Sequence, residues 1–462
     1  MESFTRGIIC SILLFSGCVT KVRGPDHPER RDPWSQASLE AYLDEVMPLV
    51  EEAAGREFTR RPKVAVADER NFGHLLAEEQ LRIYERVMPD TPPSIRRQLA
   101  EAAGRYMTSG ILGKYILETE TVYVCPSALV PAMNDLQLAP SRTGDLLKVV
   151  VAHEIVHALE DQHTDLEGVL AALEDEDALW AASAAWEGWA THVEEQVADA
   201  LDLEDIYLGL LSLQGWGEEG VTDASAWRTW AIYGQGKNFM EWHYDRGGVE
   251  QVWATLNDPP SSTSMLFRPH TWSPDVPRTD LDYAAVLRGI EQVLGDGDWL
   301  VTNSRLGEFD LRGEAAKAGN EAELDRILSH LRVARRLDAA RPDRSGGARL
   351  LVFDDALWAQ AYLDLLREQK TYDAIETALT LDMPIHVTYT VFDQIPADDA
   401  FLRVERMPLV GEFADETQSA WVLRDEVLVV VEASRFEPGD ALGRAARLIF
   451  DRLATARGQA RR

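Results

Sequence analysis

Residues 145–167 contain neither glycine nor proline, and this stretch constrains the fold more than any other part of the chain. Thr143-Gly144-Asp145 is an adequate helix start, and the next helix breaker is Gly168. The apolar residues Val149-Val150-Val151 and Ile155-Val156 would cover most sides of such a helix, which is typical of a buried helix. The sequence therefore predicts a long helix that starts near residue 143 and lies inside the protein.

This predicted helix carries two histidines, His153 and His157, one turn apart. Residues four apart on an α-helix differ by about 40° in direction, so both imidazoles can point at one metal ion. Glu154 lies beside the first imidazole, where its carboxylate can reach water at an open coordination position. This His-Glu-x-x-His spacing is typical of zinc hydrolases and predicts one Zn²⁺ with Glu154 as general base. The alternative is a helix with two buried histidines and no metal, in which each imidazole needs another polar partner.

A catalytic zinc ion takes three protein ligands, and two residues compete for the third position. His163 follows His157 by six residues, the separation found in HExxHxxGxxH sites. On an unbroken helix, six residues turn a side chain by about 240° relative to the first, away from the metal, and no glycine or proline intervenes here. Glu187 lies on the next predicted helix, about residues 178–198, beside Gly188, which can let that helix come close to the first. The sequence favours Glu187.

Other polar residues on these two helices can orient the ligands. Asp161 is four residues after His157 on the same helical face, where it can accept the second imidazole N–H, or it can be a solvated surface acid. Thr191 and Glu194, one and two turns after Glu187, are weaker candidates for the same role.

At these residues the chain resembles the gluzincins, zinc peptidases with HExxH on one helix and a glutamate ligand on a following helix. HEIVHALEDQHTDL and WEGWAT are more narrowly similar to a family of uncharacterised prokaryotic exported proteins with HELxHALQDQHFDL and an EGDAT-type segment. The similarity extends over roughly residues 100–275, including segments 233–239, 247–249 and 259–264. Two departures are Gly188-Trp189 in place of Gly-Asp, and Arg268-Pro269 before His270 where that family usually has His-Pro.

The resemblance implies hydrolysis of peptide bonds by a zinc-activated water. A further donor would stabilise the oxyanion, and the sequence leaves Tyr233, His243, Arg268 and His270 open for this role. Residues 121–124 are predicted to form the second arm of a β-hairpin and, by the same resemblance, the edge strand along which a peptide substrate lies.

The first residues predict export. An apolar run from Gly7 to Phe15 is too short to span a bilayer and ends at Ser16-Gly17-Cys18, which resembles a bacterial lipobox. Residues 1–17 would then be a signal peptide, Cys18 the lipidated N-terminus, and residues 18–36, with three prolines, a tether. This predicts a lipoprotein of the cell envelope that contacts the membrane only through the anchor. An ordinary cleaved signal or a buried N-terminus remain alternatives.

The rest of the chain predicts an α+β fold in two domains. Residues 37–279 are expected to form a zincin-like, mainly helical catalytic domain with a small sheet. Residues 280–462 are expected to form a smaller α+β domain with an antiparallel sheet. Within these domains the sequence predicts a loop over 128–145 and a helix over 321–337.

The formal charge of −32, from 46 basic and 78 acidic residues, would repel nucleic acid, so no nucleic-acid partner is expected. The predicted partner is a peptide or protein substrate, and the oligomeric state cannot be derived from the sequence. Two other functions stay open: a zinc hydrolase of non-peptide amides, and a non-catalytic envelope binding protein on a zincin scaffold. Retention of Glu154 favours an enzyme, since a structural zinc ion needs no base.

Overall fold

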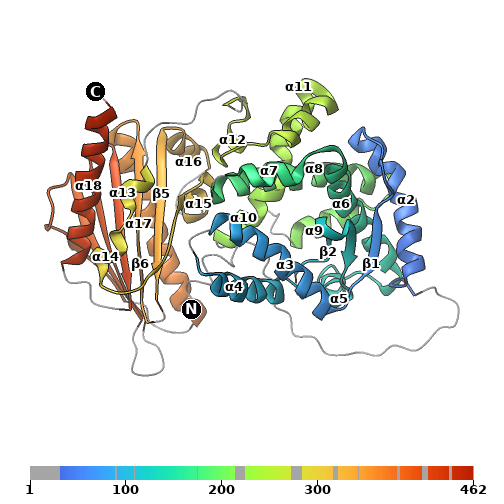
Figure 1. Ribbon diagram of the computed structural model, residues 1–462, viewed down its shortest axis with the longest axis horizontal. Coiled ribbons are helices and arrows are strands. Elements are labelled where there is room, and N and C mark those ends of the chain that lie inside the picture. Colours follow the sequence, from blue (N-terminus) through green and yellow to red (C-terminus); the bar gives the residue numbers. More distant parts are fainter. Residues whose placement is uncertain are drawn as a thin grey trace. The chain divides into compact units, whose positions relative to one another are not determined.

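A computed structural model describes residues 32–88, 91–108, 110–173, 175–213, 224–271, 283–315, 321–341, 343–381, 386–407, 415–435 and 440–460. These residues form helices and two β-sheets, which confirms the α+β prediction (Figure 1). The signal peptide over 1–17, Cys18, most of the tether and the domain boundary at 279/280 lie outside the described residues. No helix in the described part of the chain is long and apolar enough to cross a membrane.

The described residues divide into two compact units. Those up to residue 173 and from 178 to 271 form the N-terminal unit, and those from 283 onward, together with 175–177, form the C-terminal unit.

The N-terminal unit is mainly helical and contains a three-stranded sheet in the order β1-β3-β2. Its elements are α2 (Gln36–Ala54), β1 (Lys63–Val66), α3 (Glu69–Val87), α4 (Pro93–Met107), β2 (Gly113–Ile116), η1 (Leu117–Thr119), β3 (Thr121–Val124), α5 (Pro126–Asp135), η2 (Pro140–Arg142), α6 (Thr143–His163), α7 (Leu166–Ala172), α8 (Glu176–Ala200), α9 (Glu204–Leu213), α10 (Ala224–Trp230), the π-helical turn η3 (Ala231–Gln235), α11 (Gly236–Asn257), α12 (Ser264–Phe267) and η4 (Pro269–Thr271).

α6 is the central helix of this unit and is buried along nearly its whole length. Apolar side chains lie on all its sides, so it packs against α2, α9 and the strands β2 and β3. It ends at His163, earlier than the predicted break at Gly168. The reason is Asp165, whose side chain accepts a hydrogen bond from the Gly168 N–H and begins α7.

Two sequence predictions for this unit are wrong. The segment predicted as a loop over 128–145 contains helix α5, because Pro126 occupies the first helical turn, where a missing N–H costs nothing. Residues 121–124 form β3, which pairs with β1 on one side and β2 on the other. The central strand cannot receive a substrate, and the edge strand nearest α6 is β2.

The C-terminal unit is built on a seven-stranded sheet in the order β4-β5-β6-β10-β9-β8-β7, with every neighbouring pair antiparallel. Its elements are α13 (Tyr283–Leu287), α14 (Ile290–Leu294), β4 (Leu300–Arg305), α15 (Glu308–Glu314), α16 (Glu321–Leu328), β5 (Leu331–Ala340), β6 (Ser345–Phe353), α17 (Ala356–Leu381), β7 (His386–Val391), β8 (Asp399–Met407), β9 (Asp415–Arg424), β10 (Val427–Ser434) and α18 (Ala441–Ala460).

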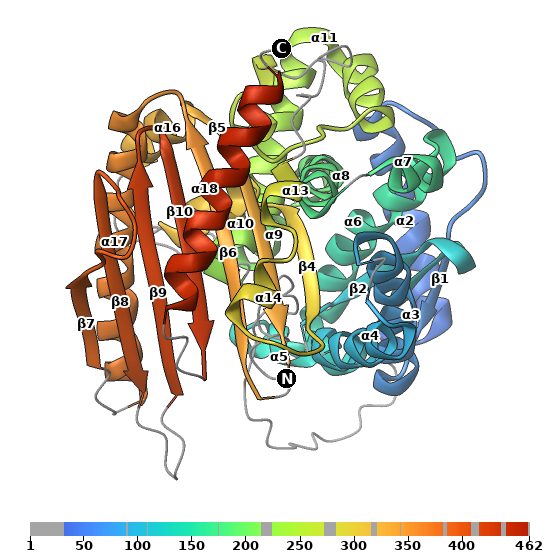
Figure 2. The ribbon, with the colours of Figure 1, turned by 60° about the vertical axis from the view of Figure 1, so that its left-hand side comes forward.

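Both faces of this sheet are covered. α18, with α13 and α14, packs on one face, and α17 packs on the other, as Figure 2 shows. The residues of β10 alternate between the two cores: Val429 and Val431 belong to the α18 side, and Leu428 and Val430 to the α17 side. This explains the uninterrupted apolar run of that strand.

The predicted helix over 321–337 is correct only to Leu328. From Leu331 the chain forms β5, which pairs with β4 and β6. The sequence of this segment has good helix formers, but pairing on both sides outweighs that propensity.

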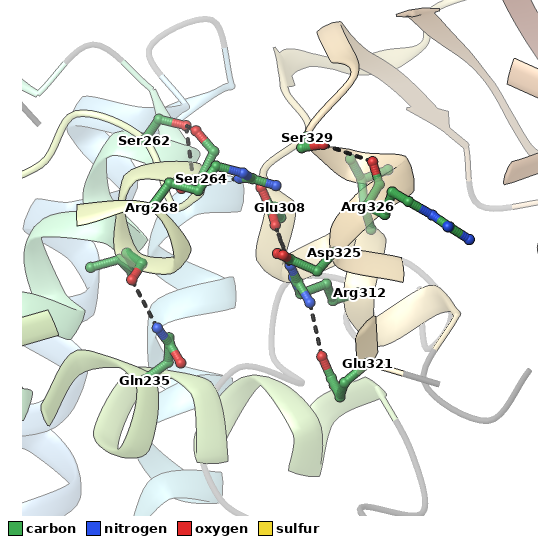
Figure 3. A network of polar contacts seen from close by, with 12 residues as sticks. Gln235, Ser262, Ser264, Arg268, Glu308, Arg312, Glu321, Asp325, Arg326 and Ser329 are labelled. Atoms are coloured by element: carbon green, nitrogen blue, oxygen red, sulfur yellow. Dashed lines mark hydrogen bonds and ion pairs between the residues drawn. The ribbon is translucent and has the colours of Figure 1, made fainter. Parts of the chain in front are cut away.

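A buried arginine fastens the helices of this unit beside the sheet. Arg312 of α15 is almost fully buried, and its guanidinium donates to Glu308, Glu321 and Asp325 (Figure 3). Three carboxylates around one guanidinium satisfy its charge and its donors, so this cluster is structural.

Candidate metal centre

The two histidines of α6 converge on one carboxylate of α8. Their rings lie 5.1 Å apart, and both Nε2 atoms point at Glu187. Glu187 Oε2 is 3.1 Å from His153 Nε2 and 3.4 Å from His157 Nε2. The structure therefore brings together the three residues that the sequence proposed as ligands.

This donor set fits a metal ion. Ligands 2.0–2.1 Å from a tetrahedral ion lie about 3.3–3.4 Å from each other, close to the two distances above. The three ligand atoms lie within 4.8 Å of one another, and their side chains are mostly buried. His153, His157 and Glu187 could hold a metal ion.

Each imidazole is oriented by a second carboxylate at its other nitrogen. His153 Nδ1 lies 2.9 Å from Glu194 Oε2, and His157 Nδ1 lies 2.8 Å from Glu160 Oε2. When Nδ1 carries the proton and donates to the carboxylate, Nε2 is left with a lone pair for a metal. These contacts therefore select the tautomer that a metal site requires.

Several ionisable side chains lie close together at this site and shift one another's pKa values. Burial lowers the pKa of His153, but hydrogen bonds to Glu187 and Glu194 outweigh it and raise that pKa well above its usual range. Burial likewise opposes protonation of His157, and the charges of Glu187 and Glu160 raise its pKa to about 9. Burial would raise the pKa of Glu187, yet the neighbouring His157 and the bond to His153 hold it well below its usual value. The carboxylates thus favour positive charge at the imidazoles, and a metal ion would bind by displacing the Nε2 protons.

Glu154 lies on the side of α6 that faces strand β2. Its carboxylate is buried, and Oε2 accepts a hydrogen bond of 2.7 Å from the Tyr115 N–H. Gly113 of the same strand is needed here, because a Cβ atom at that position would lie 2.8 Å from Val150 Cγ1 and 3.3 Å from Glu154 Cγ. The strand thus lies directly against the residue proposed as general base.

Tyr233 is the oxyanion candidate that the structure places beside the ligands. It lies in the π-helical turn η3, with its ring 6.1 Å from that of His153. Burial first, and then the charges of Glu187, Glu154 and Glu194, raise its pKa well above the usual value. The phenol therefore stays protonated and can donate a hydrogen bond.

The other oxyanion candidates have different surroundings. Arg268 Nη1 donates to the Ser264 carbonyl oxygen within its own short segment, and His270 is exposed in η4. His243 is almost fully buried beside the rings of Phe239 and Trp242, and burial lowers its pKa to about 4.

His163 points away from the ligands, as its rotation on the helix predicts. Its Nε2 lies 2.8 Å from the Glu57 carbonyl oxygen, and its ring packs near Trp253. It fastens the end of α6 to the segment after α2.

Asp161 and Thr191 do not contact the imidazoles as the sequence suggested. Asp161 accepts the Tyr115 hydroxyl at 2.7 Å, and Thr191 donates to the Glu187 carbonyl oxygen of its own helix. Glu194, a candidate for the same role, does contact His153 Nδ1. The role proposed for Asp161 belongs to Glu160, which was not predicted from the sequence. The sequence feature that could have identified Glu160 is its i+3 spacing from His157, because residues three apart lie on one face of a helix.

Gly188 also has a different partner from the one predicted. A Cβ atom there would lie 2.1 Å from the Gly236 carbonyl carbon, so the close approach is between α8 and the start of α11, not between α8 and α6. Because Tyr233 lies just before α11, this contact helps to place it next to Glu187.

A second group of possible ligands lies further along α8. His192, Glu195 and Glu241 offer atoms within 4.8 Å of one another. Lys237 already donates to both carboxylates, at 2.9 Å and 3.1 Å. An ammonium group thus supplies the positive charge in this cluster.

Comparisons with known proteins add little. No family model and no curated protein matches the chain. A presumed hydrolase with a novel fold from Chloroflexus aurantiacus is 17% identical with a TM-score of 0.37, over 53% of this chain and 91% of that one. The extracellular domain of PknH from Mycobacterium tuberculosis is 14% identical with a TM-score of 0.26, over 39% of this chain and 98% of that one. Likenesses this weak assign neither family nor function.

Proposed function

We propose that the protein is a zinc-dependent hydrolase of peptide bonds. The observation that carries this proposal is the convergence of His153 Nε2, His157 Nε2 and Glu187 Oε2, with the Glu154 carboxylate one residue from the first ligand. Nitrogen and carboxylate ligands of this kind suit zinc, and three protein ligands leave one position open for water or substrate. When bound, zinc supplies a Lewis acid that polarises a carbonyl group and makes water easier to deprotonate.

Glu154 acts as general base and then as general acid. Its carboxylate takes the proton of the attacking water and returns it to the leaving amine. The hydrogen bond from the Tyr115 N–H fixes Oε2, so the other oxygen remains to receive the proton. Burial keeps bulk water from competing for that carboxylate.

Tyr233 stabilises the oxyanion. Its phenol stays protonated and lies beside His153, so its O–H can donate to the oxygen on which negative charge develops.

The substrate strand lies along the free edge of β2. The Tyr115 N–H of this edge strand donates to Glu154, and an extended peptide can add to the strand by main-chain hydrogen bonds to Gly113 and to the Tyr115 carbonyl oxygen. We place this activity at the cell envelope on the basis of the N-terminal sequence, residues 1–18.

Replacement of Glu154 by Gln tests the mechanism. The variant is expected to bind zinc as the wild type does and to cleave a peptide library at least about a hundredfold more slowly, since the base is lost. Zinc content by atomic emission and cleavage by mass spectrometry measure the two effects.

Other outcomes identify the competing functions. If the wild-type protein cleaves non-peptide amides and no peptide, it is a zinc hydrolase of another substrate class. If Glu154→Gln and wild type have equal activity, or neither has any with zinc bound, the proposed catalytic role is wrong.

A further inference from the structure

β2 presents alternate residues to its free edge. The Leu112 carbonyl oxygen accepts a hydrogen bond of 3.3 Å from the Cys125 N–H, and pairing continues in register from there. In an antiparallel ladder every second pair is hydrogen-bonded, so Lys114 bonds with Tyr123 and Gly113 and Tyr115 point their N–H and C=O groups outward. The hydrogen bond from the Tyr115 N–H to Glu154 agrees with this assignment.

The side chains of β2 alternate between two faces. Gly113 and Tyr115 face α6, because a Cβ atom at 113 would touch Val150 and Glu154, and the Tyr115 hydroxyl donates to Asp161. Lys114 therefore lies on the opposite face, together with Tyr123, its direct partner on β3.

α3 covers the face on which Lys114 lies. Tyr123 packs against a cluster that includes Phe72 and Leu76 of α3. Glu79, one turn or less beyond Leu76 on that helix, is the carboxylate whose charge acts most strongly on Lys114. Lys114 thus lies between β2 and α3, close to the metal centre.

The Lys114 ammonium is a cation without a direct partner among the described side chains. Among the described residues it makes no hydrogen bond and no ion pair within 4 Å, although the side chain is half-buried. Burial lowers its pKa, but the charges of Glu79, Glu187 and Glu154 more than offset this and raise it above the usual value. The ammonium is not among the fully buried polar atoms, so its three N–H donors are accessible to an incoming carboxylate.

We propose that Lys114 determines specificity by pairing with an acidic side chain of a peptide extended along β2. This inference rests on the proposed function and narrows its substrate to acidic peptides. A strand added at the free edge places every second side chain on the Lys114 face, with its Cβ about 4.5–5.5 Å from that of its neighbour. A Glu or Asp side chain at that position reaches the ammonium, while the scissile bond remains on the side of His153 and Glu154.

Paired peptides test the assignment. The peptides carry Glu or Gln at successive positions around one cleavage site, each as a C-terminal acid and as an amide. Wild type is expected to show kcat/KM about tenfold to a hundredfold higher for Glu than for Gln at one position, the value of a hydrogen bond to a charged group. Lys114→Met should reduce this ratio to within about twofold, and Lys114→Arg should keep most of it. Lys63→Met is the control, because Lys63 is an exposed lysine on β1, the other edge of the sheet.

Three results would overturn the inference: an unchanged ratio in Lys114→Met, an equal loss in Lys63→Met, or a preference that depends on the free C-terminus and not on the Glu side chain. Zinc content and melting temperature of each variant show whether it folds, and Lys114→Gln replaces Lys114→Met if the latter does not.

Measurements of peptide binding test the role of Lys114 independently of the proposed peptidase activity. Calorimetry with the Glu154→Gln protein should show the same preference for Glu peptides without turnover. Preferential binding by a wild-type protein that cleaves no peptide would support Lys114 and refute the peptidase. Cleavage without any preference for acidic peptides would support the peptidase and refute the role of Lys114.

Discussion

Glu160 is the residue at the centre whose removal has the clearest consequence. It is 1% exposed, one of its oxygens contacts His157 Nδ1, and the other is buried without a hydrogen-bond partner among the described residues. A buried oxygen without a partner costs stability, so the presence of a carboxylate here needs an explanation. The explanation we propose is that Glu160 holds the imidazole of His157 in the orientation that a metal ligand requires.

Variants at Glu160 should weaken metal binding, and loss of the hydrogen-bond acceptor should weaken it more than loss of the charge alone. Glu160→Gln keeps an acceptor for the imidazole N–H and should raise the zinc dissociation constant about tenfold, and Glu160→Leu about a hundredfold. Competition with a chelator measures both, and Glu167→Gln, on the exposed side of α7, is the matched control.

Melting temperatures of the metal-free proteins, together with the zinc affinities, show whether Glu160 orients the His157 imidazole or only stabilises the fold. Glu160→Leu should also melt at a lower temperature than wild type when metal-free, since it leaves the buried His157 imidazole without its partner. A lower melting temperature with unchanged zinc affinity would mean that Glu160 serves the fold and not the metal.

Residue spacing revealed the candidate ligands and one of the carboxylates that orient them, Glu194, but not the other, Glu160. His153 and His157 could be paired from the sequence because a helix alone fixes their relation, and Glu187 needed only one further helix. Asp161 was the wrong choice of support because the Tyr115 hydroxyl, from a strand 46 residues earlier in the sequence, binds it. Contacts between elements distant in sequence decide such roles, and spacing does not encode them.

The contact between α8 and α11 is the element-level feature on which the site depends. Cβ atoms at Gly188 and Gly236 would each lie within about 2 Å of backbone atoms across this contact. The two glycines let the helix bearing Glu187 and the segment bearing Tyr233 touch through their backbones.

Gly188→Ala should separate these two helices. Because backbone cannot move aside as a flexible side chain can, the free energy of unfolding should fall by about 3 kcal/mol, and zinc affinity should fall with it. Gly458→Ala in α18 is the control, since nothing lies within 4 Å of a Cβ atom there, and it should be neutral or stabilising by up to about 1 kcal/mol. Chemical denaturation measures both variants, and a Gly188→Ala protein as stable as wild type would show that the helices can adjust.

Elements were predictable where local pattern and tertiary environment agree. α6, with apolar residues on every side and no breaker, begins where the sequence places it. β5 was missed because its Leu, Ala and Arg residues favour a helix and only the neighbouring strands make it extended. The order β1-β3-β2 could not be derived from the hairpin alone, because β1 joins it in parallel from about 60 residues away.

For the whole molecule, the N-terminal sequence predicts where the protein works. We propose that Cys18 carries lipid and that residues 18–36 tether the folded units to a membrane. The wild-type protein should then be recovered with membranes and take up labelled fatty acid, and Cys18→Ser should appear in the soluble fraction without label. Equal membrane association of the two proteins would exclude this anchor.

Location of the metal ion tests the central claim most directly. Crystals of the zinc-loaded protein, with anomalous diffraction recorded at the zinc absorption edge, should show one ion bonded at about 2.0–2.2 Å to His153 Nε2, His157 Nε2 and a Glu187 oxygen. An ion bound elsewhere, or no ion at this position with saturating zinc, would contradict it.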